Sequence, residues 1–207
     1  RSHFKISPAV FDPRPATEAL VEAVLDHAAL FPRDYWKILD LGTGSGAILC
    51  SLLQHLPGSC GVGVDRSHEA CMIAASNCAS LGLGKRAMVV CGDWTRALRG
   101  RFELIVSNPP YVTQREIVSL SPEVRDHDPL LALDGGEDGL GAYREIIPDL
   151  RNLLAPEGIV ALEVGVDQYF AVESLLRGMT GGATETKLDL NGHRRVVLAR
   201  LKQSAVA

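Results

Sequence analysis

The stretch ILDLGTGSG, residues 38–46, decides the fold of this chain. Its first four residues form a short apolar run of strand length, and a helical apolar pattern follows at residues 47–56. Glycines between a strand and a helix allow a tight turn and let backbone amides approach a ligand closely. The stretch therefore predicts a strand, a ligand-binding turn and a helix of an α/β protein.

The alternation of strands and helices continues outward from this stretch. We expect strands at residues 38–41, 61–65, 87–91, 102–107, 158–164, 184–190 and 195–201. Helices are expected at residues 16–30, 47–56, 67–81, 142–154 and 168–177, with Pro148 at a kink or break. This order predicts a mostly parallel seven-stranded sheet covered on both faces. The last two strands flank Asn191-Gly192, which favours an antiparallel hairpin.

Composition and charge narrow the class of protein. The chain has 21 basic and 25 acidic residues and a net charge of −4, which argues against binding nucleic acid mainly through phosphates. No apolar run reaches membrane-spanning length, and no signal peptide is visible. We expect one domain over residues 1–207, with a Pro-rich lead-in and helix at 1–30 and the sheet core at 31–207.

The five cysteines are odd in number and include no CxxC pair. Reduced, mostly buried thiols of a cytoplasmic protein are the expectation. His68 and Cys71 could share a helix face, but two ligands do not make a zinc site. We therefore expect no metal, and we expect a monomer.

A nucleoside ligand would fit the glycine turn and the residues after the next two strands. Asp65 ends the second strand, about 20 residues after the turn, where a carboxylate can accept hydrogen bonds from ribose hydroxyls. Asp93 could accept from an adenine amino group, and the Trp94 indole could cover the ring or simply pack in the core. The turn also fits a looser dinucleotide pattern, so an NAD oxidoreductase remains an alternative. The candidate turn residues are Gly42, Thr43, Gly44, Ser45 and Gly46.

The fourth predicted strand ends in Asn108, Pro109, Pro110 and Tyr111, at the edge of the sheet where ligands bind. The prolines fix the backbone and leave carbonyls as acceptors. An Asn oxygen and a backbone carbonyl can together accept both hydrogens of an –NH2 group, and Tyr111 can stack on the flat group that carries it. This arrangement suits methylation of a planar nitrogen, because it orients the nitrogen for in-line transfer.

Several motifs together resemble one known family. The segments GTGSG and SNPPYV, with Gly92-Asp93-Trp94, are similar to those of HemK/PrmC-type release factor glutamine N5-methyltransferases. The segment at residues 13–18 (PRPATE) resembles the PRPxTE motif of that family. Residues 132–140 resemble its AL…GGEDGL motif, and residues 162–168 and 189–197 resemble its last motifs. The resemblance covers nearly the whole chain and keeps the order of the motifs.

The resemblance implies a Rossmann-like S-adenosylmethionine-dependent methyltransferase fold and a release factor as protein substrate. It implies that the glycine turn, Asp65 and Trp94 contact S-adenosylmethionine, and that Asn108 to Tyr111 hold the target glutamine, with Asn108 also able to touch the cofactor. Arg14, Thr17 and Glu18 would help to close the site, although each could equally begin a helix or form a surface ion pair. The helical recognition domain that usually precedes the PRPxTE motif is expected to be absent.

Other functions remain open on the sequence alone. The NPPY motif also occurs in adenine-N6 methyltransferases, so an N-methyltransferase acting on adenine or guanine in RNA or DNA is the second hypothesis. Residues 112–141 carry seven acidic side chains against two arginines and one histidine, which disfavours a phosphate backbone. A ribosomal protein could replace the release factor as substrate. A silent binding module is a further alternative, and nothing in the sequence favours it.

Overall fold

The computed structural model describes residues 15–120 and 129–202, and these carry the fold. The strands are β1 Lys37–Leu41, β2 Cys60–Asp65, β3 Ala87–Cys91, β4 Phe102–Ser107, β5 Leu154–Glu163, β6 Thr184–Leu188 and β7 Arg194–Arg200. The helices are α1 Pro15–Leu30, α2 Ala47–His55, α3 His68–Ser80, α4 Gln114–Ser119, α6 Leu130–Leu133, α7 Gly141–Leu153 and α8 Tyr169–Thr180. Within these ranges, no helix has the length and apolar character that crossing a membrane requires.

The strands form one sheet in the order β3-β2-β1-β4-β5-β7-β6. The first five strands run parallel, while β7 is antiparallel to both β5 and β6. This confirms the predicted parallel sheet with an antiparallel hairpin at its end. In the register, Leu41 lies beside Ser107, and Ser107 lies beside Leu162. The segments that follow β1 and β4 therefore start at the same edge of the sheet as the end of β5.

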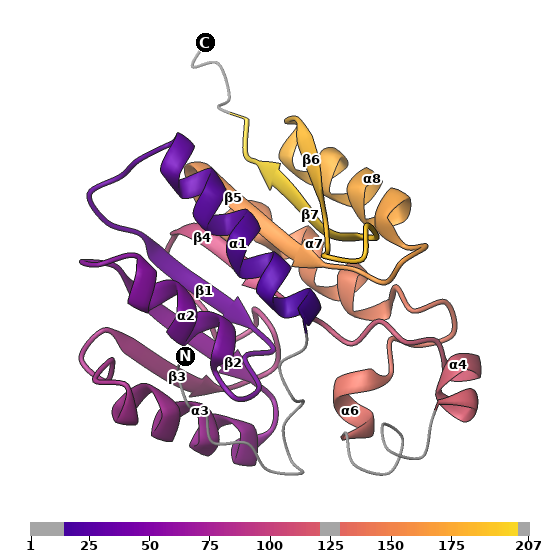
Figure 1. The fold of residues 1–207 in the computed structure, drawn as a ribbon, viewed down its shortest axis with the longest axis horizontal. Coiled ribbons are helices and arrows are strands. Elements are labelled where there is room, and N and C mark those ends of the chain that lie inside the picture. The colour runs from indigo at the N-terminus through magenta and orange to yellow at the C-terminus, as the bar shows by residue number, and fades with distance from the viewer. Residues whose placement is uncertain (1–14, 121–128, 203–207) are drawn as a thin grey trace.

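Helices cover both faces of the sheet, as Figure 1 shows with α1 and α2 in front and α7 behind. Successive strand residues point to opposite faces, so each strand contributes to two cores. Leu104 and Val106 of β4 pack in the core that α1 and α2 cover, whereas Ile105 packs in the core that α7 and α8 cover. This double burial explains why the strands read as continuous apolar runs.

Several predicted bounds differ from the observed ones by a few residues, and the two main differences are at Pro148 and at the start of β5. Helix α7 continues through Pro148 without a break. A proline inside a helix costs about 3 kcal/mol, but Ile146, Ile147 and Leu150 of α7 are buried, and each buried side chain returns roughly 1.5–3 kcal/mol. Strand β5 begins at Leu154, four residues earlier than predicted, because Leu154 pairs with Phe102 before a register shift.

The segment between β4 and α7, residues 108–140, contains the short helices α4 and α6. Both lie beyond the edge of the sheet in Figure 1, on the lower right. A capping box starts α4, because the Thr113 hydroxyl accepts from the Glu116 amide and the Glu116 carboxylate accepts from the Thr113 amide. A parallel bridge between Val112 and Asp134 closes the loop on itself. Contacts within the segment thus contribute to the structure of its described parts.

Candidate active site

A cleft of about 760 Å³ opens where the parallel strands end. Its volume lies in the range of small-molecule sites, roughly 300–1,000 Å³. Residues from the glycine turn and from the segment after β4 face the same cleft, so the two sequence motifs form one site. The predicted site residues that line it are Thr17, Gly42, Thr43, Gly44, Ser45, Asp65, Trp94, Asn108, Pro109, Pro110 and Tyr111.

Backbone contacts hold the glycine turn open. The amides of Gly42 and Thr43 both donate to the carbonyl of Val64, at 2.8 and 2.9 Å. Gly42 and Gly44 adopt φ values of +69° and +54°, which favour glycine. Apart from Gly44 and its two chain neighbours, no atom of the described residues lies within 4 Å of the position that a Cβ on Gly44 would take. The turn therefore leaves space for a ligand directly against its backbone.

Asp65 stands at the end of β2 and faces the turn. Its Oδ2 accepts from the Gly44 amide at 2.9 Å, and its Oδ1 accepts from the Ser67 amide at 2.9 Å. Each carboxylate oxygen has a second lone-pair site, so these two contacts still leave room for hydroxyl donors. Asp65 thus shapes the glycine turn, a role that the sequence did not reveal, and lines the cleft as well.

Asp40, within β1, is a buried carboxylic acid that the sequence analysis did not select. Its Oδ2 accepts from the Thr43 hydroxyl at 2.6 Å, and its Oδ1 has no hydrogen-bond partner among the described residues. Burial away from water raises the pKa of Asp40 to about 7. An acidic residue inside an apolar strand was the sequence signal that could have marked it.

Trp94 covers one wall of the glycine turn. A Cβ on Gly42 would lie 3.3 Å from the edge of the indole, so the ring and the turn are in close contact. Trp94 has a φ of +45°, which is unusual for a residue other than glycine and fixes the ring near the turn. Its indole is therefore not simply part of the core.

Three predicted site residues do not line the cleft, and a fourth cannot be assessed. Gly46 faces helix α3 instead, because a Cβ there would lie 3.3 Å from the Ala74 backbone. Asp93 forms an exposed ion pair with Arg96 at 2.9 Å. Glu18 is exposed on α1. Arg14 lies outside the described residues.

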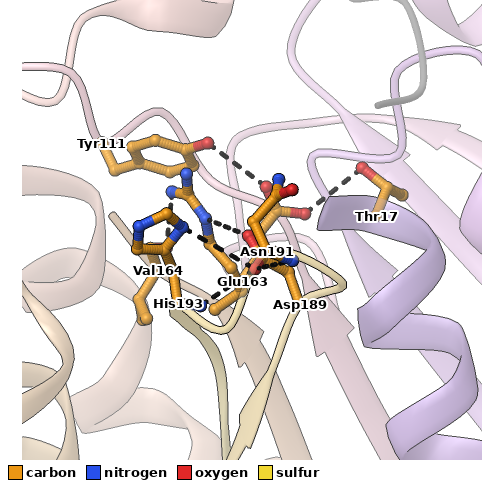
Figure 2. A network of polar contacts seen from close by, with 8 residues as sticks. Thr17, Tyr111, Glu163, Val164, Asp189, Asn191 and His193 are labelled. Atoms are coloured by element: carbon orange, nitrogen blue, oxygen red, sulfur yellow. Dashed lines mark hydrogen bonds and ion pairs between the residues drawn. The ribbon is translucent and has the colours of Figure 1, made fainter. Parts of the chain in front are cut away.

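A polar network connects the start of α1 to the segment after β4. Asn108 Nδ2 donates to Thr17 Oγ1 at 3.4 Å, and Thr17 Oγ1 donates to Glu163 Oε2 at 3.2 Å. The Tyr111 hydroxyl donates to Glu163 Oε1 at 3.3 Å. Figure 2 shows Glu163 between Thr17, which comes from α1, and Tyr111 on the other side. The side chain of Glu163 is buried, with 1% of its residue surface exposed.

The backbone of Tyr111 is held as firmly as its hydroxyl. Gln168 Nε2 donates to the Tyr111 carbonyl at 2.8 Å, while Gln168 Oε1 accepts from the Gly165 amide at 3.1 Å. A Cβ on Gly135 would lie 2.8 Å from the Tyr111 Cα, and a Cβ on Gly139 would collide with the Tyr111 carbonyl oxygen. The GGEDGL segment therefore needs its glycines in order to wrap around Tyr111.

Comparisons with known proteins agree with this site. The family described as methyltransferase small domain matches residues 4–123. A release factor glutamine methyltransferase of Caulobacter vibrioides is 48% identical over 198 residues, which are 94% of this chain and 67% of that protein. A protein of the same name from Rhodospirillum rubrum is 48% identical over 91% of this chain and 57% of its own length. The chain thus spans about two thirds or less of the length of these relatives.

The solved structures agree in fold. The crystal structure of a release factor-specific protein-(glutamine-N5) methyltransferase from Alicyclobacillus acidocaldarius has a TM-score of 0.55 at 27% identity, covering 97% of this chain and all of that one. A Thermus thermophilus 16S rRNA guanine N2 methyltransferase bound to S-adenosylmethionine has a TM-score of 0.67 at 23% identity, covering 93% of this chain and 44% of its own, and shares the fold. Sequence identity, motif order and site geometry lead to one conclusion: this chain belongs to the family of release factor glutamine methyltransferases.

Proposed function

We propose that this chain transfers a methyl group from S-adenosylmethionine to the side-chain nitrogen of a glutamine in the Gly-Gly-Gln loop of a peptide-chain release factor. One observation carries the proposal: the carboxamide of Asn108 lines the same cleft as the glycine turn. A group that can hold an –NH2 thus lies in one cavity with a turn suited to a nucleoside ligand. The names and the level of identity of the relatives support the choice of a release factor.

The residues present fit S-adenosylmethionine. The open space beside Gly44 gives the cofactor access to the turn, and Asp65 keeps acceptor capacity for ribose hydroxyls. Trp94 supplies a flat apolar surface for the adenine ring. When bound, S-adenosylmethionine supplies an electrophilic methyl group on a positively charged sulfur. Gly42 to Ser45, Asp65 and Trp94 would hold it, whereas Gly46 and Asp93 would not touch it.

Asn108 to Tyr111 form the substrate half of the cleft, which would hold the target amide, a weak nucleophile. A glutamine side-chain nitrogen has a delocalised lone pair, so its position decides the rate. The Oδ1 atom of Asn108 and a carbonyl of the adjoining proline segment would accept its two N–H bonds, while the Tyr111 ring would pack on the flat carboxamide. Acceptor oxygens also stabilise the positive charge that grows on nitrogen as the new bond forms.

The charges around the cleft favour a protein substrate over a nucleic acid. The neighbouring surface cavity is lined by Glu116, Glu137 and Asp138 together with two arginines. One of them, Arg144, is paired with Asp138 in a short bidentate contact. Acidic side chains repel a phosphate backbone, and the pairing with Asp138 neutralises Arg144.

Methyl transfer from isotope-labelled S-adenosylmethionine tests the proposal. Purified release factor, a release factor with Gly-Gly-Ala in place of Gly-Gly-Gln, total RNA and DNA are offered in parallel. We expect label only in the intact release factor, and mass spectrometry should locate one methyl group on the glutamine of the loop. Label in RNA or DNA but not in protein would replace the proposal with a nucleobase methyltransferase.

A further inference from the structure

Two hydrogen bonds next to the cleft share one direction. Asn108 donates through Nδ2 to Thr17 Oγ1, and Thr17 donates through Oγ1 to Glu163 Oε2. Thr17 and Glu163 are 6% and 1% exposed, so water has little access to either acceptor. The donors therefore run from the Asn108 carboxamide through the hydroxyl to the carboxylate.

The direction of these hydrogen bonds follows from the chemistry of Glu163, which accepts the last of them. The Thr17 hydroxyl has a single proton and donates it to the Glu163 carboxyl group, so that proton points to Glu163. The lone pairs of Thr17 Oγ1 then remain for a donor, and the Nδ2 atom of Asn108 supplies it. The two ends of an Asn carboxamide have nearly the same shape, so only such contacts decide which end faces which way.

We propose that Glu163 is a positioning residue that, through Thr17, turns the oxygen of Asn108 toward the substrate. With Nδ2 engaged by Thr17, the opposite end of the carboxamide presents Oδ1, and among the described residues no hydrogen bond occupies that atom. A reversed carboxamide would offer a donor to the target –NH2, which cannot accept it. The inference rests on the proposed function, because it assigns the acceptor that a glutamine nitrogen needs.

The same carboxylate also fixes the other substrate-facing side chain. Tyr111 donates its hydroxyl to Oε1 of Glu163, so the two carboxylate oxygens serve Thr17 and Tyr111 separately. The backbone of Glu163 is itself anchored, because the buried Tyr143 hydroxyl donates to its carbonyl at 2.8 Å. One buried acid at the end of β5 thus orients both the acceptor and the flat ring of the site.

Kinetics of matched variants test the positioning role. Glu163→Gln keeps the volume but adds an –NH2 donor, so the Thr17 hydroxyl can reverse. We expect kcat to fall by about 100-fold, as for other small misplacements of a reacting group, while the dissociation constant for S-adenosylmethionine stays within about twofold of wild type. The kcat of Thr17→Val should fall by a similar factor, whereas the kcat of Thr17→Ser, which keeps the hydroxyl, should stay within about threefold of wild type. Glu185→Gln on β6, an exposed ion-pair residue, is the matched control.

A readout without turnover keeps this inference separate from the proposed function. The side-chain amide signals of Asn108 in an ¹⁵N NMR spectrum can be assigned by their loss in Asn108→Asp. In the apo wild type, exchange of these protons with water should be slower by about tenfold or more than in Glu163→Gln or Thr17→Val. Thermal melts check that each variant is folded. If Glu163→Gln alone fails to fold, Thr17→Val and Thr17→Ser decide.

Three possible results distinguish failure of the inference from failure of the proposed function. Unchanged amide exchange in Thr17→Val overturns the inference whether or not release factors are methylated. A wild-type protein that leaves release factors unmodified refutes the proposed function, and the NMR comparison then decides the orientation of Asn108 by itself. Equal losses of kcat in Thr17→Ser and Thr17→Val would also overturn the inference, because packing rather than the hydroxyl would then be responsible.

Discussion

The two halves of the cleft are built in different ways. The glycine turn is held by contacts that are local or lie between adjacent strands, such as Thr43 with Asp40 and Gly44 with Asp65. The segment after β4 is held by side chains that are distant in the sequence, since Thr17 and Glu163 are 146 residues apart. The cofactor half therefore depends on β1, β2 and the turn that follows β1, whereas the substrate half also needs α1 and β5.

This difference separates binding from orientation. A turn that positions backbone amides needs only the right local dihedral angles. A carboxamide that must present one chosen end needs partners from other elements, here α1 and β5. Changes in the first half should therefore act on cofactor affinity, and changes in the second half should act on the rate of transfer.

Removal of the carboxamide should give the largest effect. We expect Asn108→Ala to lower kcat by about 1,000-fold, because the target nitrogen loses both its orientation and an acceptor for its developing charge. Cofactor affinity, measured by calorimetric titration, should change by less than about threefold, since the glycine turn is untouched. Transfer at full speed would show that Asn108 has no part in the reaction.

A methyl group at Gly139 should disturb the substrate half through its backbone. The added Cβ would collide with the Tyr111 carbonyl oxygen and the Gln168 amide, at a φ of +73°. We expect Gly139→Ala to lower the free energy of unfolding by about 3 kcal/mol, from backbone strain and overpacking together. Denaturant unfolding measures this value.

Gly136→Ala is the matched control for this prediction. Gly136 also has a positive φ, +89°, but within the described part of the chain only its own neighbours in sequence come within 4 Å of its Cβ position. Strain alone should then cost about 1 kcal/mol. Equal losses of stability at the two positions would mean that contact with Tyr111 is not what requires glycine in this segment.

Asp65→Ala should weaken cofactor binding and leave the rate of transfer nearly unchanged. The variant loses an acceptor for ribose hydroxyls and the contact that holds the Gly44 amide. Hydrogen bonds to a charged group contribute about 1.5–3 kcal/mol, so we expect cofactor affinity to fall by about 30-fold. At saturating cofactor, kcat should remain within about threefold. An unchanged dissociation constant in calorimetry would contradict the role of Asp65.

The smallest expected effect is on the pH dependence of the unfolding free energy, through the buried Asp40 of β1. The pKa of Asp40 is raised to about 7 in the folded protein from its ordinary value of 3.8. At pH values between these two numbers, the unfolded chain has lost the proton of Asp40 while the folded protein still holds it. The free energy of unfolding therefore falls as pH rises through this range. Between about pH 6 and pH 7, Asp40→Asn should therefore gain about 1 kcal/mol in unfolding free energy relative to wild type. Denaturant titrations at both pH values test this gain, and a constant difference would contradict it.

The sequence predicted the parts that depend on local patterns. The order of strands and helices, the turn at Gly42 to Ser45 and the NPPY segment were read from spacing and residue type, and the structure brings these motifs into one cleft. The contact roles assigned to the individual residues stay predictions. Local patterns were sufficient here because a parallel sheet brings the carboxyl ends of its strands together.

The rest depends on pairings that no local pattern encodes. Glu163 appeared in the sequence only as part of a resemblance, and its link to Thr17 arises because α1 packs over β5. Gly46 and Asp93 sit beside residues that line the cleft, but Gly46 faces α3 and Asp93 pairs with Arg96. The direction in which each faces depends on this packing and this ion pair, respectively.

The position of Trp94 also makes intrinsic fluorescence a way to detect a ligand in the cleft. The chain has two tryptophans, and Trp36 is 3% exposed beneath a guanidinium of Arg33. Trp94 instead lies at the wall of the cleft, in contact with Gly42. Because Trp36 is buried and Trp94 lines the cleft, a ligand that covers Trp94 should change the intrinsic fluorescence of the protein, without any label.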